Sequence, residues 1–143
     1  MIGKIESVAV IGEKRLEIAW DDGRVAAVDL AEVIDAHKAL APLKKKGEFA
    51  RAAVSSDGWS LEWPSGIDFG AEQVRRWADE QAGEIMRASA FRDWMDEHGL
   101  TQEAAAQALG LSRRMIAYYL CGERPIPKTV MLATEGWAAR EEA

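Results

Sequence analysis

Cysteine and histidine are scarce in this sequence of 143 residues, which contains one Cys and two His. A single thiol excludes an intramolecular disulfide and is typical of proteins from a reducing compartment. Neither His37 nor His98 has a second ligand at metal-binding spacing, so we expect no metal and no cofactor. Cys121 has no neighbouring base, and we expect an inert, partly buried thiol.

Motifs of common enzyme chemistry are also missing. The sequence has no glycine-rich phosphate loop, no G-x-G-x-x-G fingerprint and no G-x-S-x-G nucleophile elbow. It contains 24 Asp and Glu residues, yet no pair stands out as an acid and a base. We therefore expect that the protein is not an enzyme.

Long hydrophobic runs are absent as well. No stretch approaches the roughly 18 apolar residues of a membrane span, and the first 15 residues are too interrupted for a signal peptide. Hydrophobic residues make up 48% of the chain, with six Trp, which excludes a mostly disordered protein. We expect a cytoplasmic protein with one ordinary domain or two small ones.

The chain lacks a basic excess, because its net charge is −6. The sign reverses locally, since residues 99–131 hold four cationic and only two acidic side chains. The six are Arg113, Arg114, Arg124 and Lys128 against Glu103 and Glu123. A local basic face of this size can bind DNA, but few counterions are released, so a monomer would bind modestly and gain from dimerisation.

Residues 100–122 have the pattern of two short helices joined by a tight turn. Thr101 is a good N-cap for the first helix, which Gly110 ends. Ser112 caps the second helix, and Gly122 closes it where a left-handed residue is favoured. Two helices with a glycine at the corner predict a helix-turn-helix.

The second helix has one apolar face, formed by Met115, Ile116, Tyr119 and Leu120. This spacing leaves Arg113, Arg114, Ala117 and Tyr118 toward solvent. An exposed helix that opens with two arginines can enter the major groove, where arginine binds guanine O6 and N7 through two hydrogen bonds. The pattern therefore indicates DNA binding.

The segment TQEAAAQALGLSRRMIAYYLCGERPIPK resembles the lambda-repressor-like family, which has the helix-turn-helix of Cro and C1 repressors. It carries that family's T-Q-x-x-x-A-x-x-x-G-[VL]-S core, and the resemblance extends from Ala90 to about Trp137. One departure lies at Leu120 and Cys121, which are apolar where the family usually has a glutamate and a basic or polar residue. We expect this end of the helix to be packed.

The resemblance implies DNA contacts from seven side chains. Bases or the groove wall would be contacted by Arg113, Arg114 and Tyr118. The DNA backbone would be contacted by Ser112, Arg124 and Lys128, and either a phosphate or a base edge by Gln102.

The first part of the chain alternates apolar and polar residues, which is typical of β-strands. Residues 15–20 alternate most clearly, and Asp21-Asp22-Gly23 makes a hairpin turn into residues 24–30. The pattern predicts further strands over 4–11, 49–55 and 59–63, a short helix or irregular segment over 30–40, and a helix over 71–81. The lysine triplet in the loop over 44–47 could contact phosphate or an acidic partner, but the pattern favours a solvated loop. Trp59, Trp63, Phe69 and Trp77 could line a ligand pocket, but alternating aromatics favour a core.

Segments LEIAWDDGRVAAVDL, FARAAV and WSLEWPSGIDF resemble the bacterial domain of unknown function 2442, a family without a settled activity. The overall expectation is an α+β protein. An α+β domain with an antiparallel sheet spans residues 1–82, and an all-α helix-turn-helix domain spans 83–143. Apolar residues at helical spacing over 85–97 predict a nearly continuous helix at the junction, and a last helix is expected over 129–140.

Together the patterns and resemblances predict a sequence-specific, DNA-binding transcriptional regulator. It would be a repressor or an autoregulating antitoxin that acts as a homodimer on double-stranded DNA. The alternative is a protein-interaction module that binds a protein partner such as a toxin, with little or no DNA binding. Both activities coexist in autoregulating antitoxins.

Overall fold

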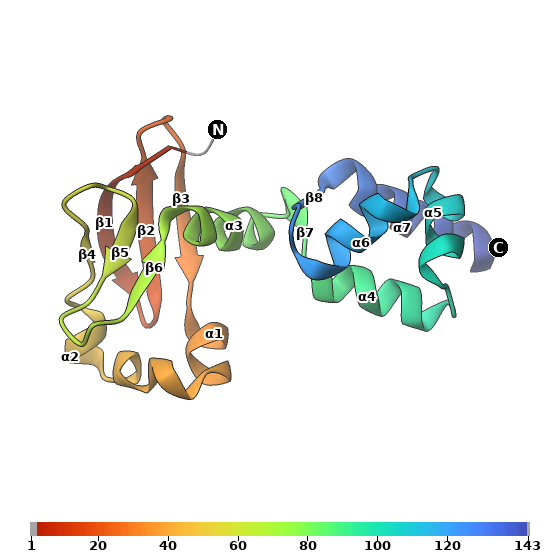
Figure 1. Ribbon diagram of the computed structural model, residues 1–143. Helices are drawn as coiled ribbons and strands as arrows, with labels where there is room; N and C mark the ends of the chain where they lie inside the picture. The colour runs from red at the N-terminus through yellow and green to blue at the C-terminus, as the bar shows by residue number, and fades with distance from the viewer. Residues whose placement is uncertain (1–2, 143) are drawn as a thin grey trace. The chain divides into compact units, whose positions relative to one another are not determined.

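The computed structural model describes residues 3–142, and the chain divides into two compact units with the boundary in sequence between Gln81 and Ala82. Within the described residues, the first unit contains two three-stranded antiparallel sheets with helices, as Figure 1 shows. The second unit contains four α-helices and a two-stranded sheet. The fold class is therefore α+β, with the helix-turn-helix in a helical C-terminal unit.

The first sheet is a meander of β1 (Ile5–Gly12), β2 (Arg15–Trp20) and β3 (Val25–Asp29) in the order β1-β2-β3. Alternation in β2 sends Leu16, Ile18 and Trp20 into the core with at most 1% of each residue exposed. The hairpin between β2 and β3 turns as the sequence predicts, since β2 pairs antiparallel with β3. Burial of one face thus sets the register of this sheet.

The second sheet has shorter strands, β4 (Ala53–Val54), β5 (Ser60–Glu62) and β6 (Asp68–Gly70). Four helical segments complete the unit: α1 (Ala31–Ala36), the 3₁₀ helix η1 (Lys38–Lys44), α2 (Lys46–Phe49) and α3 (Ala71–Gln81). Helix α3 lies against β3 (Figure 1).

Two sequence predictions for residues 44–55 are wrong. The strand expected from Phe49 is only two residues long, and the expected lysine loop lies in η1, α2 and the single residue between them. Phe49 explains the difference, because it is 3% exposed and its carbonyl accepts a hydrogen bond from Trp63 Nε1 at 3.1 Å. This tertiary contact stabilises a helical turn where local propensity favoured a strand.

Most of the aromatic set belongs to the core of the first unit rather than to a pocket. Ring centroids lie 6.2 Å apart for Phe49 and Trp63, 5.5 Å for Trp63 and Phe69, and 5.0 Å for Phe69 and Trp77. Trp59 is the exception, since it is 47% exposed and Lys4 Nζ lies 5.5 Å from its ring. The Trp63–Phe69 and Phe69–Trp77 pairs are edge-to-face, and pairs of this kind stabilise a core beyond simple burial.

Two aspartates in turns accept hydrogen bonds that favour their charged forms. Asp57 Oδ1 accepts from the Trp59 amide at 3.0 Å and from Ser55 Oγ at 2.7 Å, and the amide bond is the main cause of its lowered pKa. Asp22 Oδ1 accepts from the Arg24 amide at 3.1 Å, and this bond is the main cause of its lowered pKa.

These lowered pKa values predict acid destabilisation of the first unit. A carboxyl group whose pKa is lower in the folded state contributes stability above its unfolded value, near 3.8, and loses it as pH falls through the folded value. We expect the thermal midpoint of the first unit to decrease when the pH drops below about 4. Asp57→Asn should flatten this dependence in calorimetric scans, and an unchanged pH profile in that variant would contradict the assignment.

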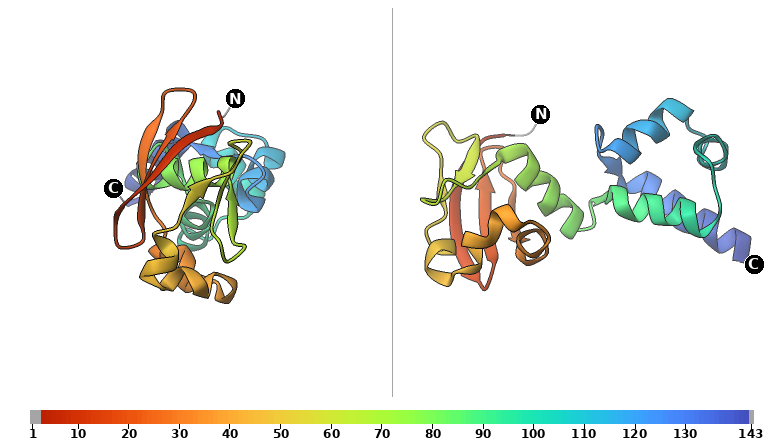
Figure 2. Two further views of the ribbon diagram at one scale, coloured as in Figure 1. Left: turned by 90° about the vertical axis from the view of Figure 1, so that its left-hand side faces the viewer. Right: turned by 60° about the horizontal axis from the view of Figure 1, so that its bottom comes forward.

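The second unit begins with β7 (Ile85–Met86) and α4 (Ala88–Glu97). It continues with α5 (Gln102–Leu109), α6 (Arg113–Cys121), β8 (Ile126–Pro127) and α7 (Lys128–Glu142). Helices α4 and α7 pack side by side, as the right-hand view of Figure 2 shows. The last helix extends slightly beyond the predicted range.

The predicted continuous helix at the junction is wrong. Helix α3 ends at Gln81, and Gly83 takes a left-handed conformation with φ of +76°. Ile85 and Met86 then pair with Pro127 and Ile126 of β8. Half-burial of Ile85 and Met86 in this short ladder competes with the helical spacing that the sequence shows.

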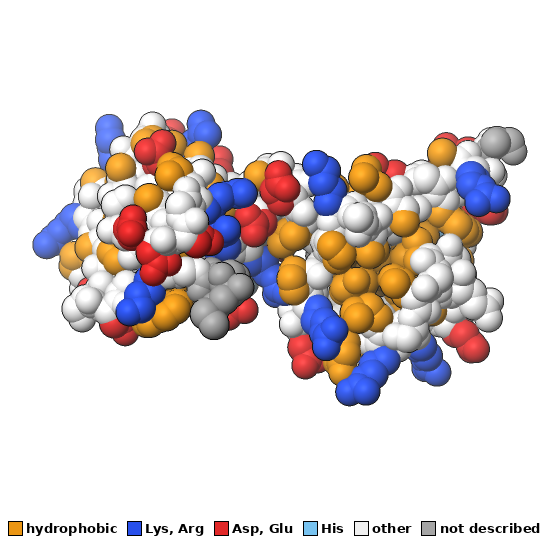
Figure 3. All heavy atoms as spheres, turned by 90° about the horizontal axis from the view of Figure 1, so that it is seen from above, with side chains coloured by type: hydrophobic (Ala, Val, Ile, Leu, Met, Phe, Trp, Pro, Cys, Tyr) orange, Lys and Arg blue, Asp and Glu red, His pale blue; other side chains and the backbone are white. Residues whose placement is uncertain are grey.

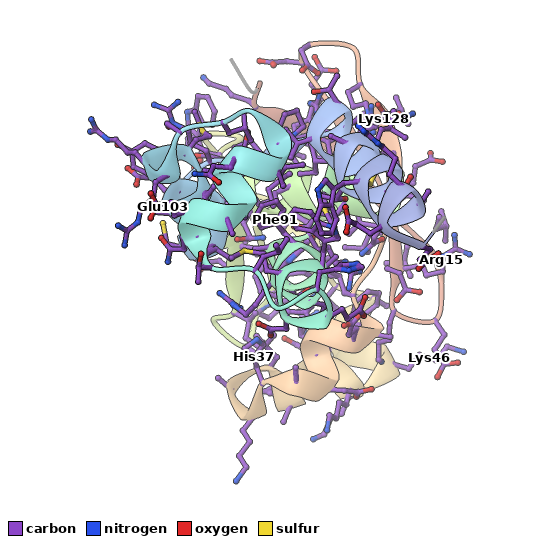
Figure 4. The ribbon with its side chains drawn as sticks, turned by 90° about the vertical axis from the view of Figure 1, so that its right-hand side faces the viewer. Arg15, His37, Lys46, Phe91, Glu103 and Lys128 are labelled. Atoms are coloured by element: carbon purple, nitrogen blue, oxygen red, sulfur yellow. The ribbon has the colours of Figure 1, made fainter. Side chains whose placement is uncertain are left out.

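Phe91 lies at the centre of the second core (Figure 4). It is completely buried, and its ring centroid lies 5.5 Å from that of Trp94 and 5.8 Å from that of Tyr119. His98 packs on Trp137 at 5.0 Å, so this histidine takes part in the packing at the end of α4. Within residues 3–142, no helix has the length and apolarity needed to cross a membrane.

Candidate nucleic-acid interface

Local capping positions α5 and α6 as the sequence predicts. The Thr101 hydroxyl accepts a hydrogen bond from the first turn of α5 at 3.1 Å, and Gly110 ends that helix with φ of +70°. The Ser112 hydroxyl accepts from the first turn of α6 at 3.1 Å, and Gly122 ends it with φ of +78°. Each of these four residues satisfies a local need of a helix end, so the motif is encoded nearby in sequence.

Helix α6 presents the predicted faces. Ile116 is completely buried and Tyr119 is 5% exposed, and burial raises the pKa of the Tyr119 phenol. Met115 and Leu120 are half-buried beside them. The opposite face has Arg113, Arg114 and Ala117 exposed and Tyr118 half-buried. The guanidinium pair therefore lies on the solvent side of the helix.

Tyr118 joins two arginines into one cluster. Arg114 Nε donates a hydrogen bond to Tyr118 Oη at 2.6 Å, and the Arg114 guanidinium carbon lies 5.4 Å from the tyrosine ring. The Arg124 guanidinium carbon lies 4.9 Å from the same ring. Cations stack favourably on such rings. Tyr118 therefore holds one arginine from α6 and one from the segment after it on a single surface.

The terminal nitrogens of Arg114 remain available to a ligand. Within residues 3–142 its side chain donates one hydrogen bond, from Nε, and in this described part no ion pair involves Arg113, Arg114 or Arg124. By contrast, Arg24 and Arg75 form ion pairs with aspartates of the first unit. An arginine approaching guanine end-on needs only these terminal nitrogens.

The other predicted contact residues are more scattered. Ser112 directly precedes the two arginines, so its cap places it beside them. Gln102 is half-buried at the start of α5, and exposed Lys128 begins α7 (Figure 4). Among the described residues, no hydrogen bond, ion pair or ring contact joins Gln102 or Lys128 to the cluster around Tyr118.

The end of α6 meets the expectation of packing only in part, because Leu120 is half-buried against the second core whereas Cys121 faces solvent. Cys121 is exposed rather than partly buried, and its Sγ donates to the Tyr118 carbonyl at 3.4 Å. Arg92 of α4 donates from Nη2 to the Leu120 carbonyl at 3.0 Å, which caps the helix with a cation. Sequence reasoning missed Arg92, because no local pattern links residues 28 positions apart.

Helix α7 also exposes an apolar side. Leu132 is 53% exposed, and Ala133 and Ala139 are exposed as well. Figure 3 shows hydrophobic side chains gathered on one face of the second unit, seen from above. Among the described residues of the second unit, Leu132 is the one large apolar side chain that is exposed.

Comparisons with known proteins match both parts of the chain. Residues 5–80 match the model of a family described as "Protein of unknown function (DUF2442)", and residues 91–133 match a helix-turn-helix model. The crystal structure of a protein from Nitrosomonas europaea, described as a "Putative DNA Binding Protein", is similar to this chain, with 38% sequence identity and a TM-score of 0.56. This match covers 95% of the present chain and 86% of the other. No curated protein matches the chain.

Proposed function

Because the chain belongs to the DUF2442 family and also carries a lambda-repressor-like helix-turn-helix, we propose that it binds specific duplex DNA and represses transcription. The observation that carries the proposal is the pair of exposed guanidinium groups at the start of α6, which no carboxylate of residues 3–142 neutralises. The similar Nitrosomonas europaea protein supports it. The role requires neither catalysis nor a cofactor, and in a bacterium it places the protein in the cytoplasm with the chromosome.

In the proposed complex, α6 enters the major groove. Arg113 and Arg114 read base edges, and Tyr118 lies against the groove wall. Phosphate contacts come from Ser112, Arg124 and Lys128, and Gln102 binds a phosphate or a base edge at the start of α5. Phosphate contacts set position and affinity, whereas base contacts set sequence preference.

A random-duplex selection on the purified full-length protein tests this function. We expect enrichment of a pseudo-palindromic sequence, followed by a saturable shift of that duplex at low salt. Affinity should fall as salt rises, because bound phosphates release counterions. Absence of enrichment, together with absence of any duplex shift at low salt, would exclude the proposal.

The same experiments address the finer antitoxin type. An autoregulating antitoxin would bind both its operator and an equimolar protein partner. A protein-interaction module without DNA binding would capture an equimolar protein partner and would shift no duplex. We favour a repressor or an autoregulating antitoxin over a module without DNA binding, because the exposed arginines of α6 have no role in packing.

We also propose that two copies pair through the exposed side of α7. A monomer brings few cations to DNA, so a second recognition helix on a two-fold related half-site is needed for tight binding. Leu132 and the exposed alanines of α7 would supply the apolar part of this interface, and a two-fold axis would bring the same surface of each copy together.

Leu132→Glu is expected to shift the protein from dimer to monomer in sedimentation experiments. The substitution would place two carboxylates at the proposed interface and remove apolar area from it. Operator affinity should fall in parallel. Ser89→Glu adds the same charge at an exposed position of α4 and should leave the mass unchanged. If Leu132→Glu keeps the dimer mass, the α7 interface is incorrect.

A further inference from the structure

A cavity of about 500 Å³ lies in the first unit, between the end of the β1–β2 hairpin and α2. This volume is within the range of small-molecule sites. Its apolar lining comes from Val10, Phe49 and Ala50. Val10 belongs to the core-facing side of β1, since it pairs with buried Leu16, yet it is 42% exposed because the cavity leaves it uncovered.

Three lysines line the same cavity, Lys14 from the hairpin turn, Lys44 from the end of η1 and Lys46 from the start of α2. Figure 4 labels Lys46. Glu13 is the one acidic residue of the lining, so the cavity has a net charge of +2. The nearby carboxylate of Glu48 is engaged elsewhere, because it accepts the Ser65 amide at 2.8 Å.

Lys14 is held in place over the apolar lining. Its Nζ donates to the Lys44 carbonyl at 2.9 Å and lies 5.2 Å from the centre of the Phe49 ring. An ammonium group has three N–H donors, so the recorded bond leaves two for another acceptor. The two contacts fix the position of a positive charge directly beside an aromatic surface.

The backbone of Lys14 supports a role for its side chain. Its φ of +59° makes it the only non-glycine residue with positive φ among residues 3–142. Glycine or asparagine adopts this conformation more easily, so the turn by itself does not favour lysine. Its carbonyl accepts the Leu30 amide at 2.8 Å, which anchors the turn. Strained residues of this kind cluster at ligand-binding sites.

We propose that this cavity binds a small organic anion with an apolar body. The ammonium groups of Lys14, Lys44 and Lys46 bind its carboxylate or phosphate, and the apolar part lies on the exposed side chains of Val10 and Ala50. Charge-assisted hydrogen bonds to several lysines favour an anion over a neutral ligand of the same shape. The site lies entirely in the first unit, so its occupancy can be tested without DNA.

Amide NMR titrations of the full-length protein test the site with three probes, octanoate, octyl phosphate and the neutral octanol. We expect saturable shifts at the amides of Gly12, Lys14 and Ala50 with at least one anionic probe. Octanol should bind roughly tenfold more weakly or not at all, because it lacks the charge. The comparison of octanoate with octyl phosphate distinguishes a carboxylate ligand from a phosphate ligand.

Paired variants separate the site from general charge effects. The double variant Lys44→Gln, Lys46→Gln should lower the affinity for the anionic probe by roughly tenfold or more. Lys45→Gln provides the control, because Lys45 lies between the other two lysines with an extended backbone and does not line the cavity. Unchanged stability of the variants is checked by their thermal midpoints.

The proposal is overturned by any of three results. The first is the absence of saturable shifts with both anionic probes. The second is equal binding of octanol, which would show that the lysines contribute nothing. The third is an equal loss per lysine removed in Lys45→Gln, which would show that only overall charge matters. None of these results bears on DNA binding by the second unit.

Discussion

Replacing Arg114 with alanine is expected to weaken binding to the selected operator by about 1–3 kcal/mol, a loss of roughly five- to 150-fold in Kd. A bidentate pair of arginine with guanine contributes this much to discrimination between bases. Arg114 is positioned for that pair, because Tyr118 Oη fixes its Nε and leaves the terminal nitrogens for O6 and N7. Fluorescence anisotropy with a labelled duplex at constant salt measures the loss.

Variants of neighbouring residues identify the source of the effect. Tyr118→Phe keeps the ring but removes the hydroxyl that positions Arg114, so it should cost about 0.5–1.5 kcal/mol. Arg15→Ala removes the same charge from an exposed position of β2 in the first unit and should change affinity little. By contrast, Lys128→Ala should weaken binding to all duplexes alike. It should also reduce the slope of log affinity against log salt concentration by about one.

The loss in Arg114→Ala should also depend on the DNA sequence. It should be large for the selected operator and small for a duplex in which the contacted guanine is replaced. Unchanged operator affinity in both Arg113→Ala and Arg114→Ala would exclude direct readout by α6. The remaining affinity would then come from phosphate contacts and DNA shape.

The helix-turn-helix was predictable from sequence because its determinants are local. Thr101 and Ser112 each cap a helix by accepting a hydrogen bond from the amide three residues later. Gly110 and Gly122 each adopt the left-handed conformation expected after a helix. Spacing alone also placed the two arginines of α6 on its solvent side. Capping and amphipathicity act within a few residues, so no knowledge of the tertiary structure was needed.

Other features depend on contacts that are distant in sequence. The pairing of Ile85 and Met86 with β8 ends the helical pattern at the junction, and it joins residues about 40 positions apart. The turn at Phe49 depends on Trp63 in the same way. These segments have sequences compatible with more than one structure, and tertiary packing selects among them.

The candidate sites show the same division. Arg114 and Tyr118 are four residues apart on one helix, so their proximity follows from helical spacing. The lysines of the cavity come from a hairpin turn and from two helices about 30 residues later, and the sequence alone predicted a solvated loop for Lys44 and Lys46 and no site role for Lys14. Only the packing of α2 against the hairpin brings them to one cavity.

Phe91→Ala is expected to destabilise the second unit by about 3–5 kcal/mol, the usual cost of removing a fully buried phenylalanine. Phe91 has no exposed surface and touches aromatic rings from both α4 and α6. Removing the Phe91 ring would leave a cavity between α4 and α6, the helix proposed to enter the major groove. Operator binding should therefore weaken as the temperature approaches the lowered midpoint, although Phe91 itself contacts no DNA.

Hydrogen exchange followed by NMR shows where this destabilisation acts. The two units have separate hydrophobic cores, so amide protection in Phe91→Ala should fall over α4 to α7 and stay unchanged in β2. Leu61→Ala, which empties a fully buried site in the first core, should give the reverse pattern at a cost of about 2–5 kcal/mol. If protection falls throughout the chain in both variants, the units unfold cooperatively, and the loss of DNA binding cannot be assigned to the second core alone.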